Sequence, residues 1–249
     1  DVLDPIGDAF ADMETTDIVF SQLRESPTGE PDIVLVNIGT EQRAGIAYLI
    51  SVINQYNPKV VGVDSFFKSP KDSIGDLLLE EAFANVENLV LVNKNDFSFD
   101  PSESEDENIQ FDTIIYSLPR FAQHGKSASA NFITEAADQD DLKMCRAFAP
   151  KETINGEVNY HLAVQLAMEF APEKAKKFLE RDNDVEIINY KGNVFDYGAT
   201  KFGTTFFALD VEDVYNENFT PDLIEGKIVI FCYLGNYLGD RQALEDKYY

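Results

Sequence analysis

The chain has 249 residues, which suits one large α/β domain or two smaller ones. Its 44% hydrophobic and 26% charged residues are ordinary for a globular domain and exclude global disorder. Acidic residues outnumber basic ones by 45 to 20, which gives a formal net charge of −25. Because nucleic-acid binding needs cations that neutralise phosphates, this excess excludes nucleic acid as an expected partner. The same argument excludes docking onto anionic lipid head groups.

Both ends of the chain look like cut points. The sequence begins at Asp1 without an initiator Met and ends at Tyr248-Tyr249. It contains no run of about 18 apolar residues, so we expect no transmembrane helix, and no signal peptide is present. We therefore expect a soluble piece of a longer protein.

Three apolar runs, at 32–39, 59–64 and 88–93, predict strands in the first half. Such nearly continuous runs are typical of strands that are covered on both faces of a parallel sheet. Helical patterns lie between them, so we expect a β-α-β-α-β unit with right-handed crossovers.

The two intervening helices have identifiable start signals and apolar faces. Thr40 is positioned to cap the first helix, and the segment from Ser73 to Asp76 resembles a capping box for the second. The expected core positions are Ile46, Leu49, Ile50 and Ile53 in the first helix, and Leu78, Ala82 and Phe83 in the second.

The second half is less regular. A polar, acidic insert over 94–110 predicts a mobile loop. The remaining patterns predict strands at 111–118, 127–133, 143–148, 185–190, 204–209 and 227–232, and helices at 160–170 and 172–180. The strands at 127–133 and 143–148 are expected to form a hairpin. We predict one α/β domain over 1–249, with three layers: a mixed, mostly parallel sheet and helices on both faces.

Cysteine and histidine residues give little sign of metal chemistry. Cys145 and Cys232 are far apart, and the sequence has no zinc-ligand spacing. We favour buried free thiols, while a disulfide stays open. His161 lies at a helix start and His124 precedes a glycine, so both are expected to be capping or surface residues. No cofactor and no metal site are expected.

Two carboxylates, Asp64 and Asp240, follow apolar strands. In open α/β sheets, ligands bind outside the carboxyl ends of the strands. Two acids there can orient polar groups of a ligand, bind a divalent cation or act in acid–base catalysis. The loop with Gly235 and Gly239 can bring backbone amides towards an anion, although a simple turn at the sheet end is the favoured interpretation.

Four stretches in this order resemble the CHASE2 family, the extracellular sensory domains of bacterial membrane receptors. They are 32–39, 58–67, 130–150 and 223–240, and the resemblance extends from about Asp17 to Tyr249. Family members often carry Trp-Pro-Arg where the first helix begins, and Arg43 matches that arginine. The chain has no tryptophan, and it has Ile38-Gly39-Thr40 where the family often has an acidic pair.

The resemblance implies a non-enzymatic, extracytoplasmic sensor in the periplasm or at the cell surface. It implies flanking transmembrane helices in the full-length protein, to which a conformational change is passed. The signal would be an unknown small molecule or protein, and a homodimer is possible. Two alternatives stay open: a metal-assisted hydrolase that uses Asp64 and Asp240, and a structural or protein-interaction module.

If a ligand binds at the strand ends, we expect seven residues to contact it. Arg43 would pair with an anionic group, and Asp64 and Asp240 would orient polar groups or a cation. The full set is Asn37, Thr40, Arg43, Asp64, Phe67, Asn236 and Asp240.

Overall fold

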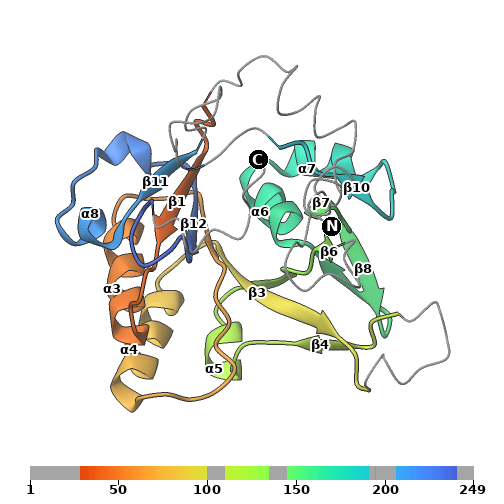
Figure 1. Cartoon of the computed structure of the whole chain (residues 1–249), viewed down its shortest axis with the longest axis horizontal. Coiled ribbons are helices and arrows are strands. Elements are labelled where there is room, and N and C mark those ends of the chain that lie inside the picture. Colours follow the sequence, from red (N-terminus) through yellow and green to blue (C-terminus); the bar gives the residue numbers. More distant parts are fainter. Residues whose placement is uncertain (1–28, 100–109, 135–144, 191–193, 195–205, 240–249) are drawn as a thin grey trace, which may run out of the picture.

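A largely parallel sheet forms the centre of the molecule (Figure 1). The computed structural model describes residues 29–99, 110–134, 145–190, 194 and 206–239. Within them, seven strands join in the order β11-β1-β12-β2-β3, and both β4 and β5 pair with β3. The strands are β1 (Ile33–Asn37), β2 (Val60–Val63), β3 (Leu89–Asp96), β4 (Thr113–Ile115), β5 (Lys126–Ser129), β11 (Phe207–Leu209) and β12 (Ile228–Cys232).

The strand directions confirm the predicted mixed, mostly parallel sheet. In this seven-stranded sheet, β3 and β4 pair antiparallel, and the other paired strands run parallel. The three apolar runs of the first half became β1, β2 and β3, and the last run became β12, which lies between β1 and β2. The central strands therefore share one edge at which their carboxyl ends meet.

One face of the sheet packs against helices α3 (Arg43–Asn54) and α4 (Ser73–Ala84), and α8 (Val211–Tyr215) adds to the same cluster. The predicted stripe of α3 is confirmed, since all its members are buried: Ile46, Leu49, Ile50 and Ile53. In α4 the buried residues include Leu79, Ala82 and Phe83, whereas Leu78 is 41% exposed. The prediction that Leu78 faces the core was wrong.

The opposite face packs against α6 (Leu162–Phe170), to which α7 (Pro172–Leu179) is attached. Side chains along a strand point alternately to the two faces of the sheet. The strand residues on either side of those that pack against α3 and α4 therefore point to the α6 face. Gly62 of β2 points there, and a Cβ built on it would lie 3.1 Å from Cδ2 of Leu166. A glycine at this position lets α6 approach the sheet closely.

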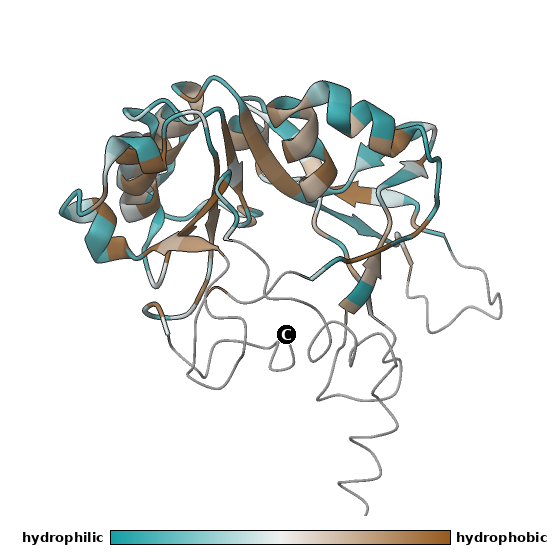
Figure 2. Cartoon of the chain, turned by 90° about the horizontal axis from the view of Figure 1, so that it is seen from above, coloured by the Kyte–Doolittle hydropathy of each residue, from teal (hydrophilic) through white to brown (hydrophobic). Residues whose placement is uncertain are grey.

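Two smaller sheets lie beside the main sheet, as Figure 2 shows. One contains β6 (Ile133–Thr134), β7 (Cys145–Phe148) and β10 (Glu186–Ile187). The antiparallel pairing of β6 with β7 confirms the predicted hairpin only in part, because most of the strand predicted at 127–133 became β5, which pairs parallel with β3 in the main sheet. The predicted turn of this hairpin lies outside the described residues. The second pairs β8 (Lys151–Ile154) with β9 (Glu157–Tyr160), a hairpin that was not predicted.

The described part differs from prediction at two helix starts and at one strand end. Thr40 is exposed and does not cap α3, whose N-cap is Gln42 without a side-chain hydrogen bond. The N-cap of α4 is Asp72, which accepts a hydrogen bond from the Gly75 amide. Asp76 does not take part in a capping box, because its carboxylate pairs with the buried Arg43.

Strand β3 continues to Asp96, so the first residues of the predicted insert pair with β4, and 100–109 lie outside the described residues.

Two short helical segments connect the remaining elements. They are α5 (Pro119–Ala122), directly after the strand predicted at 111–118, and η3 (Pro221–Leu223), which has a proline in its first turn. Within the described residues, no helix is both long enough and apolar enough to span a membrane.

Candidate functional site

Four polar side chains form a row across neighbouring strands at the carboxyl edge of the main sheet. Asn37 of β1 pairs in register with Cys232 of β12. One residue earlier, Val36 pairs with Leu209 and Phe231 pairs with Val63, so Asp210 and Asp64 continue the row on either side. Since the preceding residues belong to the α3–α4 cluster, strand alternation points this row to the other face. In order, the row is Asp210, Asn37, Cys232 and Asp64.

Asn37 is the organising residue of the row and is fully buried. Its Nδ2 donates to Oδ1 of Asp210 at 2.9 Å and to the carbonyl of Gly235 at 3.0 Å. Its Oδ1 accepts from the amides of Leu234 at 2.9 Å and Gly39 at 3.0 Å. The amide group therefore fixes both the loop after β1, where Gly39 has a φ of 49°, and the loop after β12.

Asp210 holds the other end of the loop that follows β12. Its Oδ2 accepts from the Leu238 amide at 2.9 Å, and it caps α8 by accepting from the Val211 amide at 3.0 Å. Asp213 accepts in return from the Asp210 amide, which completes a capping box. Asp210 was not predicted as a site residue, although an Asp three residues before another acid, directly after a predicted strand, is a recognisable capping signal.

Two contacts of the glycine-containing loop bear on its two interpretations. The amides of Leu234 and Leu238 donate to Asn37 and Asp210. These two donors are therefore engaged within the protein, which agrees with the favoured interpretation of a turn at the sheet end.

Asp64 is the last residue of the row and directly follows β2. Its backbone amide donates to the Phe231 carbonyl at 2.8 Å and so extends the ladder beyond β2. The residue is exposed, yet the surrounding protein desolvates the carboxylate enough to raise its pKa above the ordinary value. Within the described residues, its carboxylate has no hydrogen-bond or ion-pair partner. It is therefore a candidate contact for a ligand.

Cys232 sits between Asn37 and Asp64 and is half-buried. Burial, with a smaller contribution from the negative charge of Asp64, raises the pKa of its thiol to about 12. The thiol is therefore protonated at neutral pH. No disulfide joins Cys232 to Cys145, and both residues are half-buried rather than fully buried.

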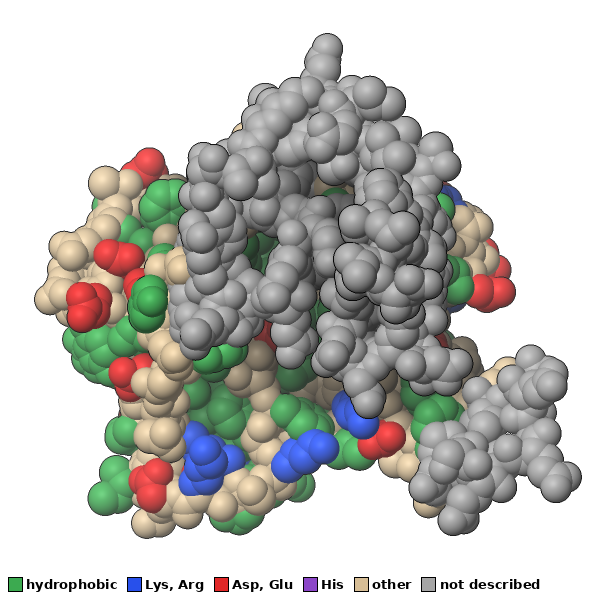
Figure 3. Space-filling view, viewed as in Figure 1, with side chains coloured by type: hydrophobic (Ala, Val, Ile, Leu, Met, Phe, Trp, Pro, Cys, Tyr) green, Lys and Arg blue, Asp and Glu red, His purple; other side chains and the backbone are tan. Residues whose placement is uncertain are grey.

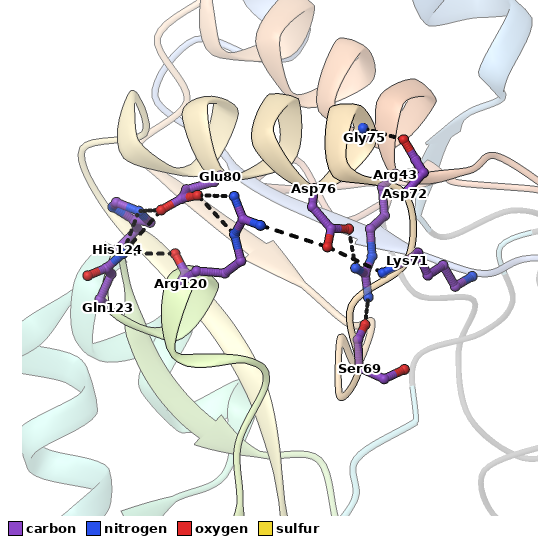
Figure 4. Close-up of polar contacts among 10 residues, drawn as sticks. All are labelled: Arg43, Ser69, Lys71, Asp72, Gly75, Asp76, Glu80, Arg120, Gln123 and His124. Carbon is purple, nitrogen blue, oxygen red and sulfur yellow. Dashed lines mark hydrogen bonds and ion pairs between the residues drawn. The ribbon is translucent and has the colours of Figure 1, made fainter.

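A second polar cluster is centred on Arg43, on the face that carries α3 and α4 (Figure 4). Arg43 is 4% exposed, and its Nη1 donates to the carboxylate of Asp76 in α4. Its Nη2 donates to the Ser69 carbonyl in the loop after β2. The guanidinium carbon lies 5.6 Å from the ring centre of Phe67 and 5.3 Å from that of Phe121. The predicted anionic partner of Arg43 is thus supplied by the protein itself.

Further charges extend this cluster along α4. Arg120 of α5 donates from Nε to Glu80 at 2.9 Å, and its Nη1 lies 3.8 Å from Oδ2 of Asp76. His124 Nε2 lies 3.8 Å from the same glutamate (Figure 4). The hydrogen bond from Arg43 holds the pKa of Asp76 below its ordinary value. Two cations thus fix the inner side of α4 against α3, α5 and the loop after β2.

The seven predicted ligand residues consequently do not form one cluster. Asn37 and Asp64 share the row, and Asn236 is exposed in the adjoining loop, where its Oδ1 lies 3.4 Å from Oη of Tyr233. Arg43 and Phe67 belong to the opposite face of the sheet. Of the remaining two, Thr40 is exposed and Asp240 lies outside the described residues.

A third polar group joins β3 to the β8–β9 hairpin and was not predicted. Asn159 donates to Asn93 at 2.8 Å and to Asn95 at 2.6 Å. Asn95 in turn donates to Glu152, whose pKa desolvation raises. The three asparagines are buried. The group thus anchors the hairpin to the main sheet, and Asn155-Gly156, with φ values of 52° and 84°, is the turn signal that predicts such a hairpin.

His161 caps α6, as expected for a histidine at a helix start. Its Nδ1 accepts from the Ala163 amide at 3.3 Å, so Nε2 carries the proton. That nitrogen is buried without a hydrogen-bond partner, next to the rings of Phe132 and Phe148. Burial lowers the pKa of His161 to about 4, and the ring is neutral at physiological pH.

The described residues contain no group of three or more His, Cys, Asp and Glu side chains that is arranged to hold a metal ion. Of the two acids in the metal-assisted alternative, the structure places Asp64 and leaves Asp240 outside its described part.

A parallel α/β sheet with polar groups at its carboxyl edge is the arrangement in which open α/β folds bind ligands. The model of the CHASE2 domain matches residues 7–243, nearly the whole chain. The chain therefore belongs to the CHASE2 family, a family of sensory domains in signalling proteins. Neither the curated proteins nor the solved structures contain a match to it.

Proposed function

We propose that this domain is the extracytoplasmic, non-enzymatic ligand sensor of a bacterial membrane-bound receptor. Membership of a sensory family supports the general role. The observation that carries the proposal is the carboxylate of Asp64, which has no partner within the described residues and lies in the same row as Asn37, with Cys232 between them. A partly desolvated carboxylate interacts strongly with a hydrogen-bond donor. The ligand that we expect at this edge therefore presents an amine, hydroxyl or other donor group to Asp64.

The signal would be a shift between two conformations of the loops at this edge. A ligand can drive such a shift only if it binds one conformation more tightly than the other. The loop after β2 begins at Asp64, and Arg43 holds it further along through the Ser69 carbonyl. The loop after β12 lies on the other side of the row. Both are placed to respond to an occupant, and flanking transmembrane helices would receive the change.

A thermal-shift screen of the purified domain tests this proposal. Metals, amino acids, sugars, nucleotides and organic acids would be screened against the wild type. A ligand at one hundred times its dissociation constant stabilises the native state by about 2.7 kcal/mol. We expect at least one saturable shift.

Two variants then locate the site. Asp64→Ala should abolish the shift without unfolding the domain, because Asp64 is exposed. Asp184→Ala removes another exposed acid, from the loop before β10, and should leave the shift unchanged. An equal shift in wild type and Asp64→Ala would refute the site. A chelator-sensitive turnover of phosphate or acyl esters would refute the non-enzymatic assignment.

A further inference from the structure

Two exposed tyrosines stack on each other where α8 packs against α3. Tyr48 of α3 is 47% exposed and Tyr215, the last residue of α8, is 40% exposed. Their ring centres lie 5.0 Å apart, and the ring planes are 18° from parallel. One turn before and after Tyr48 on the same side of α3, Ala44 and Ser51 are small and exposed, so they leave its ring open to a partner.

A carboxylate lies at one edge of this stack. Oη of Tyr215 donates to Oε2 of Glu41 at 3.3 Å. Glu41 directly precedes Gln42, the N-cap of α3, and its carboxylate lies over the first turn of the helix. A Cβ built on Gly45 would be only 1.7 Å from Oε2 of Glu41. Glycine at position 45 therefore leaves the space that this carboxylate occupies beside the stacked rings.

The segments that form this surface contain acids but no exposed base. Residues 206–226 have several Asp and Glu and no Lys, Arg or His, and Arg43, the sole Lys or Arg in residues 38–57, is buried. Elsewhere in the described residues, acids such as Glu80 and Glu169 pair with a base on another element. In Figure 3, the left margin of the molecule, where Figure 1 has α8 and α3, shows Asp and Glu side chains among hydrophobic ones and no Lys or Arg.

Three glutamates supply the negative charge of this surface. Besides Glu41, Glu212 lies three positions before Tyr215 in α8 and therefore on the same side of that helix. Glu217 follows α8, and its carboxylate accepts a hydrogen bond from Oη of Tyr56. Within the part of the chain that the structure describes, none of these three carboxylates has an ion-pair partner. They are therefore candidate contacts for cations that come from outside the chain.

We propose that the α3–α8 surface, formed by Glu41, Tyr48, Glu212, Tyr215 and Glu217, binds an arginine-containing basic segment of a partner protein. A planar guanidinium group stacks on aromatic rings and also pairs with carboxylates. On this surface an arginine that lies on the tyrosine stack has the carboxylate of Glu41 beside it. Tyrosine and arginine are also among the residues that contribute most of the energy at protein contacts.

The charge of the protein favours this occupant over others. A formal net charge of −25 attracts a basic partner, speeds its association and repels an acidic protein or a second copy. The described residues contain no group of acids arranged to hold a metal ion, so these carboxylates suit a partner that spans a surface. The row at the sheet edge reaches α8 at its N-cap, Asp210, whereas Tyr215 ends the helix, so the two sites are distinct.

A short synthetic peptide in which Arg alternates with Gly probes this surface. Fluorescence anisotropy of the labelled peptide measures binding at about 0.15 M salt, where charges beyond roughly 8 Å are screened. The wild type should bind it at least about threefold more tightly than the same peptide with Lys, because an ammonium group lacks the planar stacking surface.

Removing a ring tests the stack. Tyr48→Ser should weaken binding of the Arg peptide by at least about fivefold. Tyr116→Ser is the matched control and should bind like the wild type. Tyr116 is 39% exposed and donates to a glutamate at 3.4 Å, but it lies outside the proposed surface. Circular dichroism and the melting temperature confirm that each variant folds.

Removing a charge separates this site from general attraction to an acidic protein. Glu41→Gln keeps an acceptor oxygen for Tyr215 and removes one negative charge. Glu173→Gln removes the same charge from an exposed position in α7. Binding of the Arg peptide should fall at least about threefold more in Glu41→Gln than in Glu173→Gln. Equal losses would overturn the proposal, because general attraction alone predicts them.

Three other results would also overturn the proposal. They are equal binding of the Arg and Lys peptides, equal binding by wild type and Tyr48→Ser, and no binding at about 1 mM peptide, where association would be worth about 4 kcal/mol. In the last case, a thermal shift with a neutral oligosaccharide that Tyr48→Ser removes would identify the occupant as carbohydrate. The peptide test needs no sensed ligand, so its result is independent of the proposed site at Asp64.

Discussion

Asn37 and Asp210 are 173 positions apart in the sequence, and their side chains meet with Nδ2 and Oδ1 2.9 Å apart. This hydrogen bond joins the end of β1 to the N-cap of α8. Each partner also binds an amide of the loop after β12. The carboxyl edge of the sheet is thus organised around one fully paired amide group, and the open carboxylate of Asp64 lies two strands away in the same row.

Replacing Asn37 tests how far this edge depends on its side chain. Asn37→Ala removes the side-chain partner of the Leu234 amide and of the carbonyl of the buried Gly235. We expect the free energy of unfolding to fall by about 2–3 kcal/mol, since an unsatisfied buried polar group costs roughly 1–3 kcal/mol. Urea denaturation measures the change. Thr40→Ala, at an exposed neighbour, should stay within about 0.5 kcal/mol. Similar effects for the two variants would contradict the assigned role.

The buried pair of Arg43 and Asp76 should be vulnerable to removal of one partner. Arg43→Met leaves the buried Asp76 carboxylate without its main cationic partner, which destabilises strongly. The loss should exceed that of Lys151→Met, which removes the exposed pair with Asp182. Thermal unfolding of both variants measures the difference. Adding Asp76→Asn to Arg43→Met should recover part of the loss, and no recovery would show that Arg43 acts through packing alone.

Acid should also weaken this pair. Because the folded-state pKa of Asp76 is depressed, its stabilising contribution is complete above the unfolded value of about 3.9. It is lost as pH falls through the lower folded value. The stability gap between the wild type and Asp76→Asn should therefore be constant near neutral pH and shrink in strong acid.

The buried His161 should make stability depend on pH in a second range, at higher pH than the range set by Asp76. Its folded pKa is about 4, whereas an unfolded histidine has a pKa near 6.5. The unfolded state therefore takes up a proton first as pH falls. The stability linked to this group is complete above about pH 7 and declines by about 3 kcal/mol on the way to pH 4.

His161→Asn isolates that contribution, because Asn can also cap α6. We expect the variant to lose less stability than the wild type between pH 7 and pH 4. Urea titrations at several pH values give the difference curve, in which the many carboxylates common to both proteins cancel. Parallel curves would show that His161 is not neutral and buried in solution.

The thiol of Cys232 should react slowly while the protein is folded. With its pKa raised to about 12, it has a very small thiolate fraction at pH 8, and the thiolate is the reactive form. We expect iodoacetamide to modify it at least about tenfold more slowly than in urea-unfolded protein, as measured by mass spectrometry. Asp64→Asn should accelerate the reaction slightly, because burial contributes more than the charge. Rapid modification in the folded state would contradict the placement of Cys232.

Much of the main sheet could be predicted from the sequence, because its strands are nearly uninterrupted apolar runs. The apolar runs at 227–232 and 59–64 indicate buried parallel strands, whichever strands they pair with. Their order is not readable, since β12 inserts between β1 and β2 through pairing across the whole chain. The local signal at Ser73 was ambiguous, because Asp72 is an equally good cap one residue earlier.

The site was harder to predict because the direction of a side chain depends on register. Asn37 and Asp64 are correctly placed at strand ends, but Arg43 and Phe67 lie across the sheet from them. Asp76 is 33 positions from Arg43, and an i,i+3 spacing made it look like a capping residue. Leu78 satisfied the helical period, yet the buried face of α4 is set by Asp76 and is rotated away from it.

The central claim is that an occupant at Asp64 changes the loops of the carboxyl edge. Hydrogen exchange, with and without the compound that gives the largest saturable thermal shift, tests it most directly. The account predicts that protection changes at 64–72 and 233–239, and that Asp64→Ala removes the change. Protection that changes elsewhere, such as in the β8–β9 hairpin, while both loops stay as they were, would contradict it.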